Sequence, residues 1–249
     1  MPQRSHLVLI AGGAVALAVV VALIAWQVHA TQLQARLLTT DPEKIPASPE
    51  LVDYAASLAK PAFAKNCASC HGADMKGDQA KGAPNLTDQI WLYDLGGVGD
   101  VERTVLYGIR SGLGKSRNIT DMPAMGRTLQ LSPAEVHDVE TFVLSLTRPE
   151  ADLGAVQRGS KIFQTKGSCY DCHSSDAAGN PDYGAPDLAD NEWLYGGDPQ
   201  TVYRSIYDGR HGVCPAWIGK LKPAVIRALA VYIHMVSQPA PPRKGAVHG

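Results

Sequence analysis

The sequence has almost no net charge, because 23 basic residues stand against 24 acidic ones in a chain of 249 residues. It therefore lacks the positive excess that would attract nucleic acid or an anionic surface. Phenylalanine is scarce as well, with three residues against nine tyrosines and four tryptophans. Tyrosine and tryptophan join apolar area to a polar group, so this bias favours pocket walls that need both.

The chain also lacks a sixth cysteine that would make its cysteine count even. Four of its five cysteines lie in two copies of one pattern, CASCH (67–71) and CYDCH (169–173). The fifth, Cys214, stands alone within GRHGVCPAW (209–217) and needs a separate explanation. The length and the 45% hydrophobic content suffice for one large domain or two small ones.

The N-terminus contains an uncharged run of 20 residues from Leu7 to Trp26. As a helix this run would be about 30 Å long, the thickness of the hydrocarbon core of a bilayer. We expect residues 1–30 to be a retained transmembrane anchor with its N-terminus in the cytoplasm, followed by a linker over 31–51. A cleaved signal peptide is the alternative, with Arg4 before the apolar run and VHA (28–30) as the cleavage site.

The rest of the chain repeats itself once. CASCHGADMKGDQAKGAPNLTDQIWLY (67–93) aligns with CYDCHSSDAAGNPDYGAPDLADNEWLY (169–195). Further along, TVLYGIRSG (104–112) is aligned with TVYRSIYDG (201–209), which gives the first copy five extra residues before this block and five after it. The next matching pair is Met-Pro at 122–123 with Cys-Pro at 214–215.

Each copy closes with an amphipathic helix that starts near a proline, Pro133 or Pro223. We therefore predict a mainly α chain with two tandem domains of one fold, over 52–148 and 149–238. The segment TRPEADLG forms the linker between them, and 239–249 is expected to be a disordered tail.

Cys-x-x-Cys-His is the attachment motif of c-type haem. Its two thiols, three residues apart on one helical turn, can add to the two vinyl groups of a porphyrin, and the adjacent histidine then lies beneath the iron. A redox pair, a zinc site or a disulfide does not require that histidine. The repeat predicts two covalently attached haem c groups, on Cys67 and Cys70 with His71, and on Cys169 and Cys172 with His173.

The first haem also needs a ligand on its opposite, distal side. Met122 is preferred over Met125, because the following proline holds the loop rigid and because Met122 aligns with Cys214. Histidine–methionine ligation raises the reduction potential, as electron transfer among high-potential carriers requires. Met125 is then expected to pack beside the haem.

Further residues are expected around the haems. The carbonyls of Pro84 and Pro186 can accept the Nδ1–H of the haem histidines and fix their orientation. Arg110 and Arg210 are candidate partners of the haem propionates. Trp91 and Trp193 are expected to pack on the haem edge or in the core rather than to relay electrons.

At these residues the sequence resembles the CcoP/FixP family, the dihaem cytochrome c subunit of cbb3-type oxidases. The resemblance rests on the single anchor, residues 41–72, PNLTDQIWLY (84–93), DMPAMG (121–126), GAPDLADNEWLYGG (184–197) and GRHGVCPAW. It implies two class I cytochrome c folds on the periplasmic side of the inner membrane, held by a single-pass anchor. It also implies His71 with Met122 and His173 with position 214 as the axial pairs.

Two features depart from the family's pattern. The family usually has a longer N-terminal segment, whereas this chain enters its apolar run at Leu7. The family also has methionine where this chain has Cys214. As a thiolate, Cys214 would bind the second iron and lower its potential, which predicts a low-potential, low-spin second haem.

Three other interpretations of the Cys214 position stay open. His211, three residues earlier, could swing in to give bis-histidine ligation. The site could be five-coordinate or water-bound with a buried thiol. Cys214 could also be an engineered substitution or an intermolecular disulfide partner.

The resemblance implies an electron-transfer subunit that is not catalytic by itself. It would receive electrons from a soluble cytochrome c or the bc1 complex and pass them to oxidase core subunits. A membrane-tethered shuttle, or the electron-accepting subunit of a periplasmic dehydrogenase, is the alternative. A haem-based peroxidase or gas sensor is less well supported, since no acid–base pair other than His211 accompanies the Cys214 loop.

Overall fold

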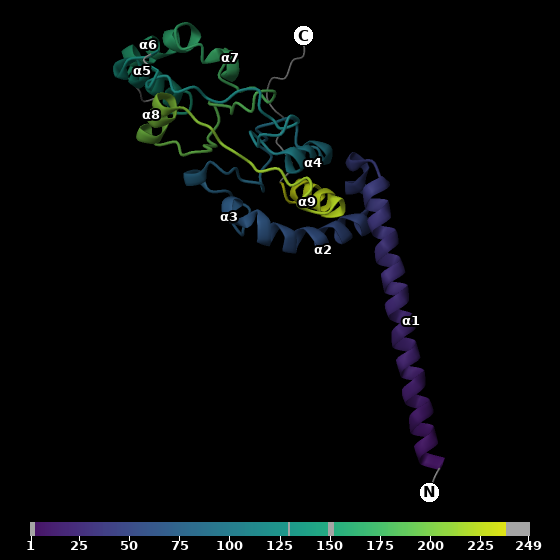
Figure 1. The fold of residues 1–249 in the computed structure, drawn as a ribbon. Helices are drawn as coiled ribbons and strands as arrows, with labels where there is room; N and C mark the ends of the chain where they lie inside the picture. Colours follow the sequence, from purple (N-terminus) through teal and green to yellow (C-terminus); the bar gives the residue numbers. More distant parts are fainter. Residues whose placement is uncertain (1–2, 129, 149–151, 238–249) are drawn as a thin grey trace.

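The computed structural model describes residues 3–128, 130–148 and 152–237, with side chains from residue 17 onward. The described residues are mainly helical and contain isolated β-bridges but no strands, in agreement with the expected fold class (Figure 1). The elements are α1 (Gln3–Thr39), η1 (Pro42–Ala47), α2 (Pro49–Asn66), α3 (Ala68–His71), η2 (Gln79–Lys81), α4 (Val98–Tyr107), α5 (Pro133–Ser145), α6 (Leu153–Gln164), α7 (Tyr170–His173), α8 (Pro199–Asp208) and α9 (Pro223–Val236). The expected tail over 239–249 lies outside the described residues.

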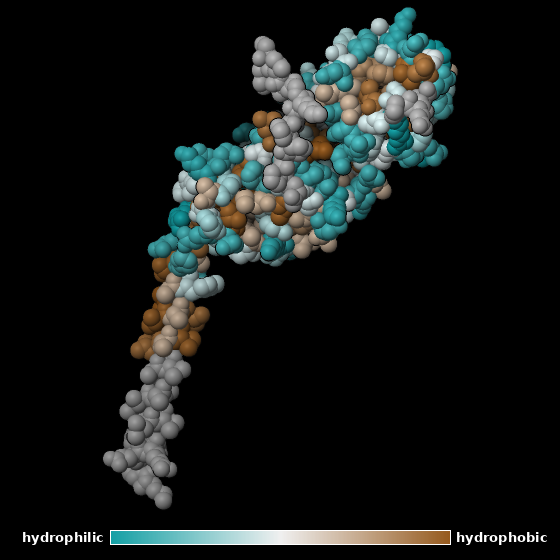
Figure 2. Space-filling model, turned by 180° about the vertical axis from the view of Figure 1, so that it is seen from behind, coloured by the Kyte–Doolittle hydropathy of each residue, from teal (hydrophilic) through white to brown (hydrophobic). Residues whose placement is uncertain are grey.

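Helix α1 is a single helix of 37 residues that projects away from the rest of the molecule (Figure 1). Its described part carries exposed apolar side chains, whereas polar residues cover most of the body above it (Figure 2). The segment Leu17–Thr39 has a mean hydropathy of 1.4 and is long enough to cross a membrane. The helix continues nine residues past the expected end of the anchor, and there Leu33 and Leu37 are buried against the body.

The globular part consists of two bodies, and each contains helices from both sequence repeats. In the first body, α9 packs on α2 and α4. In the second body, α5 packs on α6 and α8. Figure 1 shows the yellow helix α9 beside the blue helix α2, while α5 to α8 gather at the other end. The closing helix of each repeat therefore completes the core of the other repeat.

The two chain segments change bodies at one crossing point. Ile109 and Cys214 exchange two backbone hydrogen bonds, of 2.9 and 3.0 Å. Met122 and Arg210 exchange another two, of 3.1 and 3.0 Å. The first repeat thus leaves the first body after Ile109 and enters the second at Met122, and the second repeat makes the opposite transfer between Arg210 and Cys214.

A glycine precedes each crossing segment and is required there. Gly108 and Gly209 end α4 and α8, each with a φ of 72°. A Cβ on Gly108 would overlap the carbonyl oxygen of Cys214, and a Cβ on Gly209 would overlap that of Met122. Only glycine allows both the left-handed turn and this close approach of the two chains.

The structure corrects the sequence alignment of the two repeats. Gly108 corresponds to Gly209 and the buried Val101 corresponds to the buried Val202, so residues 104–112 do not match 201–209. The sequence alignment was wrong by one helical turn, because similar residues recur at four-residue spacing in both helices. Nearly all of the extra length of the first repeat therefore lies after the helix: Met122 comes 13 positions after Ile109, whereas Cys214 comes four after Arg210.

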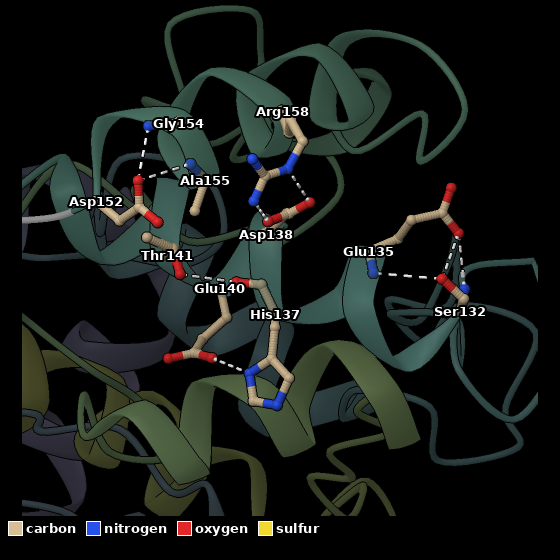
Figure 3. A network of polar contacts seen from close by, with 10 residues as sticks. All are labelled: Ser132, Glu135, His137, Asp138, Glu140, Thr141, Asp152, Gly154, Ala155 and Arg158. Atoms are coloured by element: carbon tan, nitrogen blue, oxygen red, sulfur yellow. Dashed lines mark hydrogen bonds and ion pairs between the residues drawn. The ribbon is translucent and has the colours of Figure 1, made fainter.

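The exchanged pair α5 and α6 is joined by a close helix crossing and by an ion pair (Figure 3). Arg158 on α6 donates from Nε and Nη2 to the carboxylate of Asp138 on α5, at 2.8 and 2.7 Å. The next residue, Gly159, lies so close to α5 that a Cβ would overlap the carbonyl oxygen of Asp138. Ser132 and Glu135 form a capping box at the start of α5, which satisfies two backbone N–H groups there.

Candidate haem sites

Both Cys-x-x-Cys-His motifs fold as a single helical turn, α3 or α7, that ends at the histidine. The Nδ1 atom of His71 lies 3.1 Å from the carbonyl oxygen of Pro84, and that of His173 lies 3.0 Å from the carbonyl oxygen of Pro186. A carbonyl only accepts, so the proton is on Nδ1 and the lone pair of Nε2 is free to bind a metal. Burial lowers the pKa of both histidines, which keeps the rings neutral.

A large, mainly apolar pocket opens above His173. Its floor holds Cys169 and Cys172 of the second repeat, and Met122 of the first repeat lies in its wall. Further apolar walls come from both repeats: Val139, Val143, Phe163, Leu188, Val202 and Ile206. The structure therefore brings Met122 of the first repeat to the pocket that holds the second motif.

The first site has the complementary composition. The backbone pairing with Ile109 carries Cys214 into the first body, and its sulfur is close enough to Cys67 for its charge to raise the pKa of the Cys67 thiol, after the larger effect of burial. Trp91 and Leu86 pack in the same core beside Cys67. The structure thus brings Cys214 close to the cysteines of the first motif.

The structure brings Cys214 to the first body and Met122 to the His173 pocket, whereas the family resemblance implies His71 with Met122 and His173 with Cys214 as the axial pairs. The reason is the crossing at Ile109 and Arg210, which delivers each distal loop to the opposite body. The unusual thiol thus lies near the first motif, in the body that contacts α1.

The competing distal residues are placed differently: Met125 lines the same pocket as Met122, whereas His211 does not. His211 is exposed, and its Nδ1 lies 2.9 Å from Oδ2 of Asp121. Met125 is buried in the core of the second body with only 8% of its surface exposed, as expected of a packing residue. Burial raises the pKa of the Cys214 thiol to about 11, so a bound metal would have to displace its proton.

The residues of both sites fit haem c. All four motif cysteines are free thiols, which is the state that forms thioether bonds. Each site combines a neutral histidine that has a free Nε2 with a sulfur supplied by the opposite repeat, and the second site is lined mainly by apolar side chains. This donor set matches low-spin iron in a porphyrin.

The structure places the two expected arginines differently. Arg210 lies in the wall of the His173 pocket, donates from Nε to Ser205 at 3.0 Å and stacks on the ring of Tyr195 at 4.1 Å. Arg110 lies in the wall of the same pocket, but its Nε and Nη1 donate to the backbone carbonyls of Gly212 and Thr120. A contact of either guanidinium with a propionate stays a prediction.

Sequence reasoning missed Arg117, which makes in the first body the same kinds of contact that Arg210 makes in the second. Arg117 donates from Nε to Thr104 at 3.0 Å and lies over the ring of Tyr93 at 5.2 Å. It is 8% exposed and forms an ion pair with Asp94. Only the corrected register reveals the equivalence, because Arg117 lies in the insertion and has no partner in the sequence alignment.

The WLY segments connect the two sites. Tyr93 packs against Gly184 in the GAP turn of the second repeat, and Tyr195 packs against Gly82 in the GAP turn of the first. The tryptophans stay with their own repeats, Trp91 in the core beside Cys67 and Trp193 in the core beside Cys169. This agrees with the expectation that they pack in the core.

A second cavity, of about 230 Å³, lies between the two GAP loops and is acidic. Pro84 and Pro186 both line it, and so do the charged residues Lys76, Asp78, Asp88, Asp187, Asp190 and Glu192. Burial, followed by the charges of Asp187, Glu192 and Asp88, raises the pKa of Asp190 to about 6. A carboxyl that titrates near neutral pH therefore lies next to both proximal loops.

Comparison with known proteins agrees with this geometry. Residues 56–147 match the family described as cytochrome c, and residues 154–233 match cytochrome c oxidase, cbb3-type, subunit III. These matches coincide with the two sequence repeats and not with the two packed bodies. Cytochrome c domains carry covalently bound haem, and two matches support two such groups.

Three relatives are each named as a subunit of a cbb3-type cytochrome c oxidase. The chain is 43% identical over 204 residues to the cbb3-type cytochrome c oxidase subunit FixP of Bradyrhizobium sp. (strain ORS 278), which covers 80% of this chain and 67% of that protein. It is 41% identical over 201 residues to FixP of Azorhizobium caulinodans, with coverages of 80% and 66%. It is 36% identical over 204 residues to CcoP of Azospirillum brasilense, with coverages of 80% and 68%. The chain thus spans about two thirds of the length of these relatives and belongs to the CcoP/FixP family of cbb3-type cytochrome c oxidase subunits.

Proposed function

We propose that the protein is a membrane-anchored dihaem cytochrome that passes electrons from a periplasmic cytochrome c or the bc1 complex to the core of a cbb3-type oxidase. The first haem would be held by Cys67, Cys70, His71 and Cys214, and the second by Cys169, Cys172, His173 and Met122. When bound, each haem c supplies a one-electron iron couple. The apolar walls of the His173 pocket keep water from the metal, and the two proline carbonyls hold the histidine protons on Nδ1.

The observation that carries the proposal is the rigid attachment of α1 to the first body. Arg227 on α9 donates from Nε to Glu102 on α4 at 2.7 Å, and both side chains are largely buried. The same guanidinium donates from Nη1 to the carbonyls of Leu37 and Thr40 at the end of α1, at 3.3 and 3.1 Å. One cation thus joins the anchor helix to two helices of the first body.

The short connection after α1 is held in place as well. Glu43 in η1 accepts backbone hydrogen bonds at the start of α4, from Gly99 at 2.7 Å and from Val98 at 3.2 Å. Arg36 near the end of α1 donates to Glu50 in α2 at 2.5 Å. A shuttle that swings between partners needs a slack tether, whereas this attachment holds the first haem at a fixed height above the membrane, as a subunit of a larger complex requires.

The position of Cys214 bears on the direction of electron flow. The site with the thiol lies in the body that packs on α1, so with α1 in a membrane it would lie nearer the membrane than the His173 site. Thiolate ligation at Cys214 would lower the potential of this first haem relative to the histidine–methionine site. Electrons that enter at the His173 site would then move uphill to the membrane-proximal site, which would limit the rate of transfer.

Affinity purification of the full chain from its native membrane tests this function. We expect the oxidase core to copurify, and we expect its oxidation of reduced cytochrome c to be lost when the chain is deleted and restored when it is supplied. Purification without a haem–copper oxidase would overturn the proposal and favour a tethered shuttle or a dehydrogenase subunit. Carbon monoxide binding to the reduced protein would instead indicate an open site and a peroxidase or sensor.

A further inference from the structure

Arg110 begins the insertion that distinguishes the first repeat from the second. Its backbone lies in the left-handed region, with a φ of 48°, and its N–H donates to the carbonyl of Arg117 at 2.9 Å. A residue other than glycine rarely adopts this conformation. From this turn Arg110 reaches the pocket of His173 and is one of the residues that line it.

The guanidinium of Arg110 joins two backbone carbonyls from different repeats. Its Nε donates to Gly212 at 2.5 Å, and its Nη1 donates to Thr120 at 3.0 Å. Gly212 lies two residues before Cys214, and Thr120 lies two residues before Met122. One side chain therefore binds both distal loops, in each case at the residue two positions before the sulfur-containing residue.

A second contact crosses between the same loops. The carboxylate of Asp121, next to Met122, lies 2.9 Å from Nδ1 of His211. In the corrected register His211 is the counterpart of Arg110, since each follows a residue of the crossing, Arg210 or Ile109. The two loops are thus braced to each other from both sides, and Arg110 is the partly buried member of the two braces, whereas His211 is exposed.

We infer that Arg110 is a positioning residue shared by the two haem sites, which holds the sulfur of Met122 and the sulfur of Cys214 over their irons at the same time. The inference rests on the proposed haem ligation. Hydrogen bonds from a charged donor to a carbonyl are stronger than neutral ones, so both loops lose an anchor when the guanidinium is removed. Lysine cannot replace it, because an ammonium lacks the planar fork that spans two acceptors.

The test compares Arg110→Met, Arg110→Lys and the control Arg148→Met. Arg148 also donates to a backbone carbonyl, that of Gly197, but it is exposed and makes no contact with either distal loop. Each variant is combined with Cys67→Ala/Cys70→Ala or Cys169→Ala/Cys172→Ala, so that one haem is observed at a time. The ligand-field spectrum and the affinity for added imidazole, which competes with the distal sulfur, are measured for each ferric haem.

We expect Arg110→Met to tighten imidazole binding about tenfold at both haems and to change both spectra, whereas Arg148→Met leaves both unchanged. If Arg110→Met prevents haem attachment, Arg110→Lys keeps the charge and should still tighten imidazole binding at one haem or both. An effect of Arg110→Met at only one haem, at neither, or equal to that of Arg148→Met would overturn the inference, as would an Arg110→Lys protein like the parent. If the proposed ligation itself is wrong, the single-haem proteins that still carry Arg110 will already show no sulfur ligand in their spectra.

Discussion

Ile109 and Cys214 lie in different repeats, yet they exchange both of their backbone hydrogen bonds, at 2.9 and 3.0 Å. This pairing, with its counterpart between Met122 and Arg210, moves each distal loop and each closing helix into the opposite body. Neither haem site is complete within one repeat. Each haem site would therefore be built from residues of both repeats.

The close crossing of α5 and α6 predicts a large effect of one methyl group. Gly159→Ala places a Cβ against the backbone carbonyl of Asp138, which cannot move without separating the helices. We expect the free energy of unfolding to fall by about 1–3 kcal/mol, although alanine favours a helix. Chemical denaturation of the parent and the variant holoproteins measures this difference in the free energy of unfolding.

Gly154→Ala is the matched control on the same helix. Its new Cβ would meet only the side chains of Asp152 and Arg158, at 3.2 and 3.4 Å. We expect it to be neutral or to stabilise the protein by up to about 1 kcal/mol. Equal effects of the two alanines would show that the crossing is looser than described.

The Arg227 contacts predict that the anchor helix can be uncoupled from the first body. Arg227→Met removes the ion pair with Glu102 and the two hydrogen bonds to the end of α1. We expect the free energy of unfolding to fall by about 2 kcal/mol and the backbone amides of residues 38–42 to exchange faster. Arg204→Met, an exposed change on α8, is the control, and unchanged exchange in Arg227→Met would contradict the rigid attachment.

The acidic cavity predicts a pH dependence of stability. The pKa of Asp190 is about 6 in the folded protein and is raised from 3.8, so the folded state binds this proton more tightly than the unfolded state. This contribution to stability is complete below pH 3.8 and is lost as the pH rises through 6. Asp190→Asn should therefore stabilise the protein at pH 8 relative to the parent, and much less at pH 4.

Asp182→Asn, an exposed change outside the cavity, controls for the loss of one negative charge. The parent and the two variants are unfolded with denaturant at pH 4 and at pH 8. A parent and an Asp190→Asn protein whose stabilities change in parallel between the two pH values would show that Asp190 does not titrate in this range.

The thiol predicts a selective change of one potential. Cys214→Met should raise the potential of the haem on Cys67 and Cys70 by well over the roughly 59 mV that corresponds to a tenfold change in a one-electron equilibrium. The potential of the haem on Cys169 and Cys172 should change by less than this amount. Two similarly high potentials in the parent protein, found by redox titration, would rule out thiolate ligation at Cys214.

Much of each site could be predicted from the sequence because its chemistry is local. The cysteines and the histidine of each motif lie on one turn, and the proline carbonyls that face His71 and His173 follow at the same spacing in both repeats. The pairing of His71 with Cys214 could not be predicted. A closing helix makes the same kind of contacts whichever repeat supplies it. The residue pattern is therefore compatible with helices that pack on their own repeat and with helices that are exchanged between the repeats.

The register of α4 and α8 was missed for a related reason. Thr104 matches Thr201 in the sequence, but its structural counterpart is Ser205, whose hydroxyl accepts from Arg210 as that of Thr104 accepts from Arg117. Similar residues one turn apart hide such a shift. Only the backbone pairing at the crossing reveals it.

The exchange of distal ligands is tested most directly by Met122→Leu in the two single-haem proteins. With only the haem on Cys169 and Cys172 present, we predict that Met122→Leu abolishes the sulfur-to-iron charge-transfer band of the ferric protein and lowers the potential. With only the haem on Cys67 and Cys70 present, the same substitution should leave the spectrum and the potential unchanged. Loss of sulfur ligation at the haem on Cys67 and Cys70, with the other haem unaffected, would contradict the exchanged arrangement.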